Sequence, residues 1–135
     1  MSAIAGSSLE ALPESEALAL LNSSDVVRVI FTDKALPSVR PVTAGLWGTT
    51  LYFRTTADGR LAAAADGSVL TVEADEVDSH TRTGWSVIAT GIASLVHDPQ
   101  ELAVIRTLVE PWAPGRHSVA VRVPLRVITG RRITV

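Results

Sequence analysis

Most of this chain has the alternating or β-branched residue pattern of β-strands. In the longest such segment, residues 84–97, every second residue from Trp85 to Leu95 is apolar or glycine, whereas the other face mixes Ser and Thr with Ile and Val. Side chains alternate between the two faces of a strand, so this pattern predicts one long strand. Shorter segments of the same kind lie at residues 25–33, 38–47, 49–55, 69–74, 118–123 and 125–135. Together they predict six or seven strands.

Three short helices are predicted between these strands. Pro13 followed by Glu14 and Glu16 is typical of a helix start, and the helix continues to Leu21. Residues 61–65 form an Ala-rich helix, and Asp98-Pro99-Gln100-Glu101 is a capping box that starts a third. We expect residues 75–78 to form an acidic loop. Strands mostly follow one another without regular helical crossovers, so the pattern predicts an antiparallel barrel with a few short helices.

The length and composition indicate one folded domain over residues 1–135, with residues 1–10 flexible. The chain has 47% hydrophobic and 19% charged residues, too apolar for a disordered chain. A domain of this size buries about two thirds of its unfolded surface. It therefore supports a core of its own.

Charge and residue content exclude several classes of function. The formal net charge of −2 argues against nucleic-acid binding. The chain has no Cys, and its apolar runs are far shorter than the ~18 residues of a membrane helix. The three His are widely separated and none lies beside a nucleophile elbow, so no catalytic triad is predicted. We expect no metal, no membrane contact and a cytoplasmic location.

Arginine is the basic residue of this chain, with 11 Arg to one Lys. Six of the Arg follow Val104, where only Glu110 opposes them. Such a basic third indicates either an anion site or Arg side chains in solvent on outer strand faces.

Two clusters carry candidate binding chemistry. Arg54 and Arg60 flank the turn at Gly59, which opens a predicted helix. Guanidinium groups and a helix N-terminus both suit phosphate. The alternative is a cross-strand pair at Arg54 and a solvated Arg60. In the second cluster, Trp85 and Ser86 offer either a flat wall for a planar ring or a core anchor.

With these clusters identified, the chain resembles the pyridoxamine 5′-phosphate oxidase-like flavoproteins, the FMN-binding split-barrel family, in its small single-domain bacterial members. The resemblance runs from about Leu12 to Val135. It rests on motifs in the family's order: Leu20-Leu21, Val39-Arg40-Pro41-Val42-Thr43, Leu51-Tyr52-Phe53-Arg54-Thr55 with Gly59-Arg60-Leu61, Thr83-Gly84-Trp85-Ser86-Val87, Glu110-Pro111-Trp112-Ala113-Pro114-Gly115, and Thr129-Gly130-Arg131-Arg132-Ile133.

The resemblance implies a mainly β fold, a six-stranded antiparallel Greek-key split barrel, that pairs into a homodimer with FMN at the interface. Arg54, Thr55 and Arg60 would hold the flavin phosphate, with Leu61 beside them. Arg40, Val42 and Thr43 would pass along the isoalloxazine ring. Trp85 and Ser86 would belong to the wall of the site or to the core beneath it. The remaining cofactor contacts would come from the partner subunit, through Trp112 and either Arg131 or Arg132.

The function that this resemblance implies is a flavin-dependent oxidoreductase acting on a small molecule. No catalytic residue is assigned: His117 and Ser86 are the only candidates for acid–base work beside the ring, and neither is an obvious general acid or base. Two alternatives stay open. One is a non-catalytic protein that stores or presents FMN or a deazaflavin coenzyme. The other is a cofactor-free dimeric split-barrel module.

Overall fold

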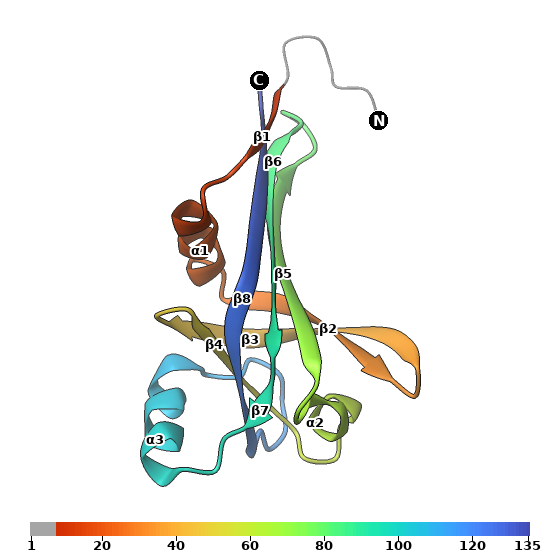
Figure 1. Ribbon diagram of the computed structural model, residues 1–135, viewed down its shortest axis with the longest axis vertical. Coiled ribbons are helices and arrows are strands. Elements are labelled where there is room, and N and C mark those ends of the chain that lie inside the picture. Colours follow the sequence, from red (N-terminus) through yellow and green to blue (C-terminus); the bar gives the residue numbers. More distant parts are fainter. Residues whose placement is uncertain (1–7) are drawn as a thin grey trace.

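Six antiparallel strands close into a ring in the computed structural model, which describes residues 8–135 (Figure 1). The ring runs β8–β4–β3–β2–β5–β6 and closes because β6 also pairs with β8. This confirms the predicted six-stranded antiparallel split barrel. Its strands are β2 (Val26–Asp33), β3 (Leu36–Trp47), β4 (Thr50–Thr55), β5 (Val69–Asp78), β6 (Thr83–Ile92) and β8 (Val119–Thr134).

Two short strands and three helices are added to this ring. Both β1 (Ser8–Ala11) and β7 (Ser94–Leu95) pair with β8. The helices are α1 (Glu14–Asn22), α2 (Arg60–Ala65) and α3 (Pro99–Leu108). Figure 1 shows α2 and α3 near one end of the long strands and the C-terminal end of β8 at the other. Within residues 8–135 none of the helices has the length and apolar character needed to cross a membrane.

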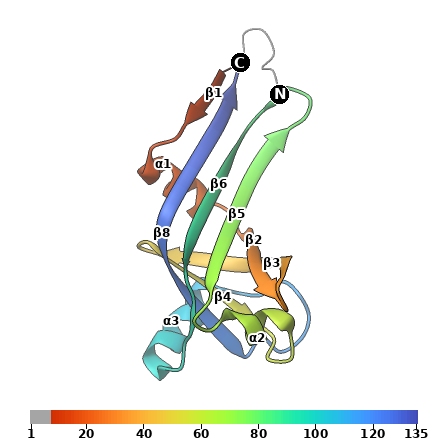
Figure 2. The ribbon, with the colours of Figure 1, turned by 45° about the vertical axis from the view of Figure 1, so that its right-hand side comes forward.

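The barrel is split because two strands change partners along their length. β3 pairs with β2 up to Thr43 and with β4 from Ala44. β8 pairs with β4 up to Pro124 and with β6 from Leu125. In Figure 2, β3 accordingly crosses the long strands β5, β6 and β8 at a steep angle.

The structure corrects three sequence-based boundaries. Residues 118–123 and 125–135 are one strand, because Pro124 lies where β8 changes partner and Leu125 supplies the next N–H, to the carbonyl of Thr49. The long 84–97 segment breaks at Ala93, whose N–H turns to the carbonyl of Ser68.

The third correction concerns the acidic segment 75–78, which is strand rather than loop. It pairs with residues 83–86 across a tight hairpin, and Asp75 is held by Arg28 of β2 at 2.9 Å. At the N-terminus, residues 8–10 of the segment expected to be flexible belong to β1, and residues 1–7 lie outside the described residues.

The core consists of two apolar clusters. The larger fills the barrel and includes Phe53, Leu61 and Val72, with Leu21 of α1 closing one side. The smaller lies between α3 and the barrel wall and consists of Tyr52, Val96, Ile105, Val109 and Ala120. This second cluster places α3 against β4 and β8.

A polar contact also fixes α3 to the barrel. The guanidinium of Arg122 on β8 donates to both carboxylate oxygens of Glu101 on α3, at 2.5 and 2.6 Å. Tyr52 of β4 donates its hydroxyl to the same carboxylate at 3.3 Å. Burial raises the pKa of Tyr52, and the negative charge of Glu101 raises it further, against the opposing effect of Arg122.

The titration of Tyr52 tests this arrangement directly, because it is the only tyrosine in the chain. We expect the absorbance of the phenolate to appear with a midpoint above 10.0, the usual pKa. Glu101→Gln lowers that midpoint, because it removes the negative charge and leaves Arg122 in place. Stability from Tyr52 is fully present below pH 10.0 and is lost as pH rises through the higher folded pKa. A midpoint at or below 10.0 in the folded protein contradicts the geometry.

A second prediction concerns Gly91, where β6 and β8 shift register. A Cβ at Gly91 would lie 2.2 Å from the carbonyl oxygen of Pro124. We expect Gly91→Ala to lower the free energy of unfolding by about 2 kcal/mol, measured by urea denaturation. In the control Gly48→Ala there is open space but a φ of +64°, and the expected loss is about 1 kcal/mol. Equal losses would show that the β6–β8 approach is not tight.

Candidate functional site

The opening of the barrel between β3 and β4 is the candidate site. Pairing of these strands stops at Ala44 and Phe53, whereas β4 continues along β8 through Arg54 and Thr55. The segment that follows α3, residues 109–118, enters this opening. There the backbone N–H of Trp112 donates to the Thr43 hydroxyl at 3.3 Å.

The guanidinium of Arg54 is fixed by the same segment. It donates to the carbonyl oxygens of Val109 at 3.4 Å and of His117 at 3.1 Å. The structure therefore brings together three of the residues expected from the sequence. Thr43 and Arg54 both contact residues 109–118, the segment that contains Trp112. Trp112 itself is largely exposed.

A cleft of about 510 Å³ opens beside Arg54, between α3 and residues 115–118. We call it the arginine cleft. Its lining combines four basic side chains with an apolar floor and consists of Arg54, Leu102, Ile105, Arg106, Gly115, Arg116, His117, Ser118 and Ala120. A volume of this size suits a small organic ligand.

The positive charge of the arginine cleft is not neutralised by the protein. Among residues 8–135 no carboxylate lies within 4.0 Å of Arg54, Arg106 or Arg116, whereas Arg28, Arg60, Arg122 and Arg132 all have acidic partners. Arg106 and Arg116 were not among the residues expected from the sequence, and His117 was expected only as an acid–base candidate without an assigned role. The excess of Arg after Val104 was the signal that could have found the two arginines.

Arg60 lies apart from the arginine cleft, at the start of α2. Its Nε is 3.7 Å from the Asp33 carboxylate and its side chain is 58% exposed. Thr55 and Leu61, beside it in the sequence motif, are both buried. α2 has six residues and no side-chain cap, so its dipole would contribute little to the binding of a phosphate. Arg54 and Arg60, expected to hold one phosphate together, thus have different partners.

The other expected residues lie on strands away from the arginine cleft. Arg40 is exposed on β3 opposite Val29, and Val42 packs against the core. Trp85 also packs against the core, as its alternative interpretation proposed. Ser86 pairs with Arg131 across β6 and β8.

The register of β8 separates Ser86 and Arg131 from the cleft. Arg54 pairs with Ala120, eleven positions before Arg131 on the same strand. At roughly 3.3 Å per residue this is on the order of 30 Å. One chain alone does not unite the two groups.

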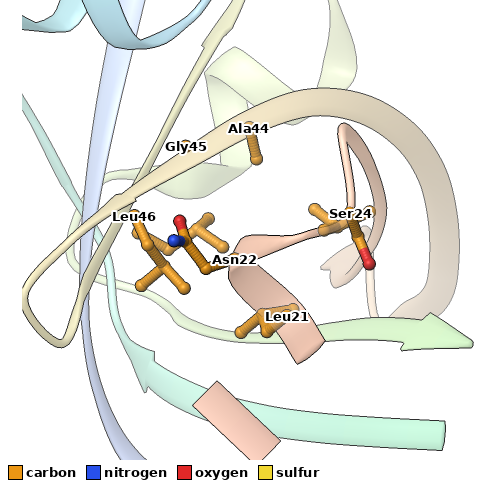
Figure 3. Close-up of a pocket in the computed structure, with 8 residues that line it drawn as sticks. Leu21, Asn22, Ser24, Ala44, Gly45 and Leu46 are labelled. Atoms are coloured by element: carbon orange, nitrogen blue, oxygen red, sulfur yellow. The ribbon is translucent and has the colours of Figure 1, made fainter. Parts of the chain in front are cut away.

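A second cavity is too small for a ligand. It measures about 10 Å³ and lies where the end of α1 meets β3, lined by Leu21, Asn22, Ser24, Val27, Ala44, Gly45, Leu46 and Leu51 (Figure 3). This volume holds one water molecule at most.

Comparison with known proteins places this geometry in a family. The family model for pyridoxamine 5′-phosphate oxidase matches residues 13–132. An uncharacterised protein of Mycobacterium tuberculosis is 39% identical over 127 residues, which cover 90% of this chain and 84% of that protein.

Solved structures agree with that match. An FAD-binding protein of Mycobacterium smegmatis has a TM-score of 0.73 at 29% identity, covering 93% of this chain and 98% of that one. A candidate pyridoxamine 5′-phosphate oxidase of Corynebacterium glutamicum has a TM-score of 0.80 at 30% identity, covering 94% of each chain. The matched region contains the barrel strands except the last two residues of β8, and it includes the three segments that carry Arg54, Arg106 and Arg116. This chain therefore belongs to the pyridoxamine 5′-phosphate oxidase family of split-barrel proteins.

Proposed function

We propose that this protein is a flavin-dependent oxidoreductase that binds FMN and acts on a small molecule. Two facts support a flavin: the family match, and the FAD bound by the M. smegmatis protein, whose fold this chain shares over nearly its whole length. The structural observation that carries the proposal is the opening between β3 and β4, where Thr43, Arg54 and Trp112 meet at the end of β4 that β3 leaves unpaired on one side. When bound, the flavin supplies the hydride and electron transfer.

The residues near this opening fit a phosphate-bearing flavin. Arg60 has a half-exposed guanidinium whose contact with Asp33, at 3.7 Å, is longer than a hydrogen bond. Its donors are therefore available to the flavin phosphate. Arg40, Val42 and Thr43 offer backbone groups along β3 to the polar edge of the ring, where β3 leaves β4.

We propose in addition that a second copy of the chain completes the site. Exposed apolar residues gather on the outer face formed by β5, β6 and β8. On this face Val69 pairs with Ile92, and Val127 with Thr90. Val127 and Ile92 are 64% and 57% exposed. An exposed apolar face of this kind is typical of an interface.

The same outer face carries Ser86 and Arg131, which alternate with the apolar residues along their strands. A homodimer through this face would carry both residues toward the opening of the partner subunit. That arrangement would bring together the two groups that one chain holds on the order of 30 Å apart.

Flavin binding is the first test of the proposed function. We expect the purified protein to bind FMN at micromolar levels, and Arg60→Ala to weaken that binding about tenfold or more, measured by quenching of flavin fluorescence. Arg126→Ala, which removes an exposed arginine from β8, serves as the control. FAD and a deazaflavin coenzyme are titrated in parallel. Failure of all three to bind would favour the cofactor-free module.

Turnover separates an oxidoreductase from a storage protein. We expect the photoreduced holoprotein to pass electrons to a quinone or nitroaromatic acceptor faster than free FMN does, followed by the return of flavin absorbance. Rates equal to those of free flavin across a broad panel of acceptors would favour the storage role.

The interface has its own test. We expect Ile92→Glu to convert a dimer into a monomer, measured by light scattering after gel filtration, because it places a charge beside Val69 in the apolar part of the outer face. FMN affinity should fall at least tenfold in the same variant. Leu36→Glu, at an exposed apolar residue at the start of β3, is the control. A monomeric variant that still binds FMN tightly would show that the site lies within one chain.

A further inference from the structure

The arginine cleft holds more positive charge than the proposed flavin site uses. Arg54, Arg106 and Arg116 come from β4, α3 and the following loop, so the fold brings them together from three separate segments. Like charges gathered on one surface repel one another unless an anion lies among them. Among residues 8–135 the protein supplies no such anion within 4.0 Å of the three guanidiniums.

The acidic residues closest along the chain do not change this balance. Glu101, one turn before Ile105 on α3, has both carboxylate oxygens engaged by Arg122. Glu110 follows Val109 and is exposed, and it makes no ion pair among the described residues. The charge in the cleft is therefore available to a ligand.

Arg54 is held in place before any ligand arrives. Two of its N–H groups donate to the carbonyl oxygens of Val109 and His117, and the side chain is half-buried. These contacts fix the plane of the guanidinium and leave its other donors free. A fixed guanidinium loses little conformational entropy when it binds an oxyanion.

His117 forms part of the wall of the cleft. Its Nδ1 lies 3.1 Å from the carbonyl oxygen of Gly115, which can only accept, so Nδ1 carries a proton and donates it. The hydrogen bond holds the ring at the mouth of the cleft, together with Ser118 from the same loop.

The floor of the cleft is apolar. Leu102 and Ile105 of α3 and Ala120 of β8 lie beneath the basic side chains. An inorganic ion alone would leave this surface uncovered, whereas a small organic molecule with a charged group at one end would contact both parts. The volume of about 510 Å³ accommodates such a molecule.

We propose that the arginine cleft is a second binding site, which takes a small organic molecule through a phosphate or diphosphate group. Guanidinium forks match pairs of phosphate oxygens, so Arg106 and Arg116 close on the oxyanion from α3 and the loop while Arg54 meets it from β4. The site is distinct from the proposed flavin phosphate site at Arg60. It does not depend on flavin being bound.

Calorimetric titration of inorganic diphosphate, at low ionic strength, tests the site. We expect binding that an Arg106→Ala and Arg116→Ala double variant weakens about a hundredfold, since each lost charged hydrogen bond accounts for about tenfold. The control double variant, Arg82→Ala and Arg126→Ala, removes the same charge from exposed positions elsewhere and should change the affinity less than about twofold.

Two further measurements distinguish this site from the flavin phosphate site. Saturating FMN should leave diphosphate binding unchanged, and Arg60→Ala should weaken FMN without affecting diphosphate. The double variant Arg106→Lys with Arg116→Lys keeps both positive charges but lacks the guanidinium forks. Its affinity for diphosphate should lie between those of the wild type and the alanine double variant. The lysine variant therefore tests the site independently of whether the alanine variant folds.

Several results would overturn the proposal. Absence of diphosphate binding at millimolar concentration would do so, as would equal binding by the alanine double variant and its control. Displacement of diphosphate by FMN would show that the cleft is the flavin's own phosphate site. Because FMN affinity is measured separately, this outcome is distinguishable from failure to bind flavin.

Discussion

The pairing of β8 is the constraint on which the rest of this structure depends. This strand of sixteen residues pairs with β4 in its first part and with β6 in its second, and it also carries β1 and β7. The change of partner at Pro124 closes the ring of six strands. β3 also changes partner, from β2 to β4 at Ala44, and this leaves the end of β4 beyond Phe53 without β3 beside it. The opening that forms the candidate site is thus a consequence of how the barrel closes.

The placement of α3 turns that opening into a site. Its apolar residues pack against β4 and β8, and Glu101 receives hydrogen bonds from Arg122 and Tyr52. Tyr52 and Arg54 share one face of β4. The Tyr52 side chain contacts α3, whereas the Arg54 side chain contacts the loop that follows α3. A structural contact and a candidate binding residue therefore lie two positions apart on a single strand.

The candidate binding residues are divided between two distant parts of the fold. Arg54 and Thr43 lie at the opening, whereas Ser86 and Arg131 lie far along β6 and β8 on the exposed outer face. A rigid sheet cannot bring these groups together within one chain. The same face carries the exposed apolar residues Ile92 and Val127, on which the proposed dimer rests.

The sequence by itself determined the fold class, the three helices and the arginine-bearing segments, because strand alternation, capping residues and Gly turns are local signals. The sequence did not predict the continuity of β8, because β8 pairs with β4 and β6, which lie far from it along the chain. Nor did it predict that residues 75–78 are strand; they pair with residues 83–86 across a hairpin, and Arg28 of β2 binds Asp75. The same holds for the site. The local pattern predicted that Arg54 and Arg60 act together across one turn. In the tertiary structure Arg60 contacts Asp33, whereas Arg54 lines the arginine cleft with Arg106 and Arg116. Which arginines share a ligand is decided by packing, since charge density in space is not a property of neighbouring residues in sequence.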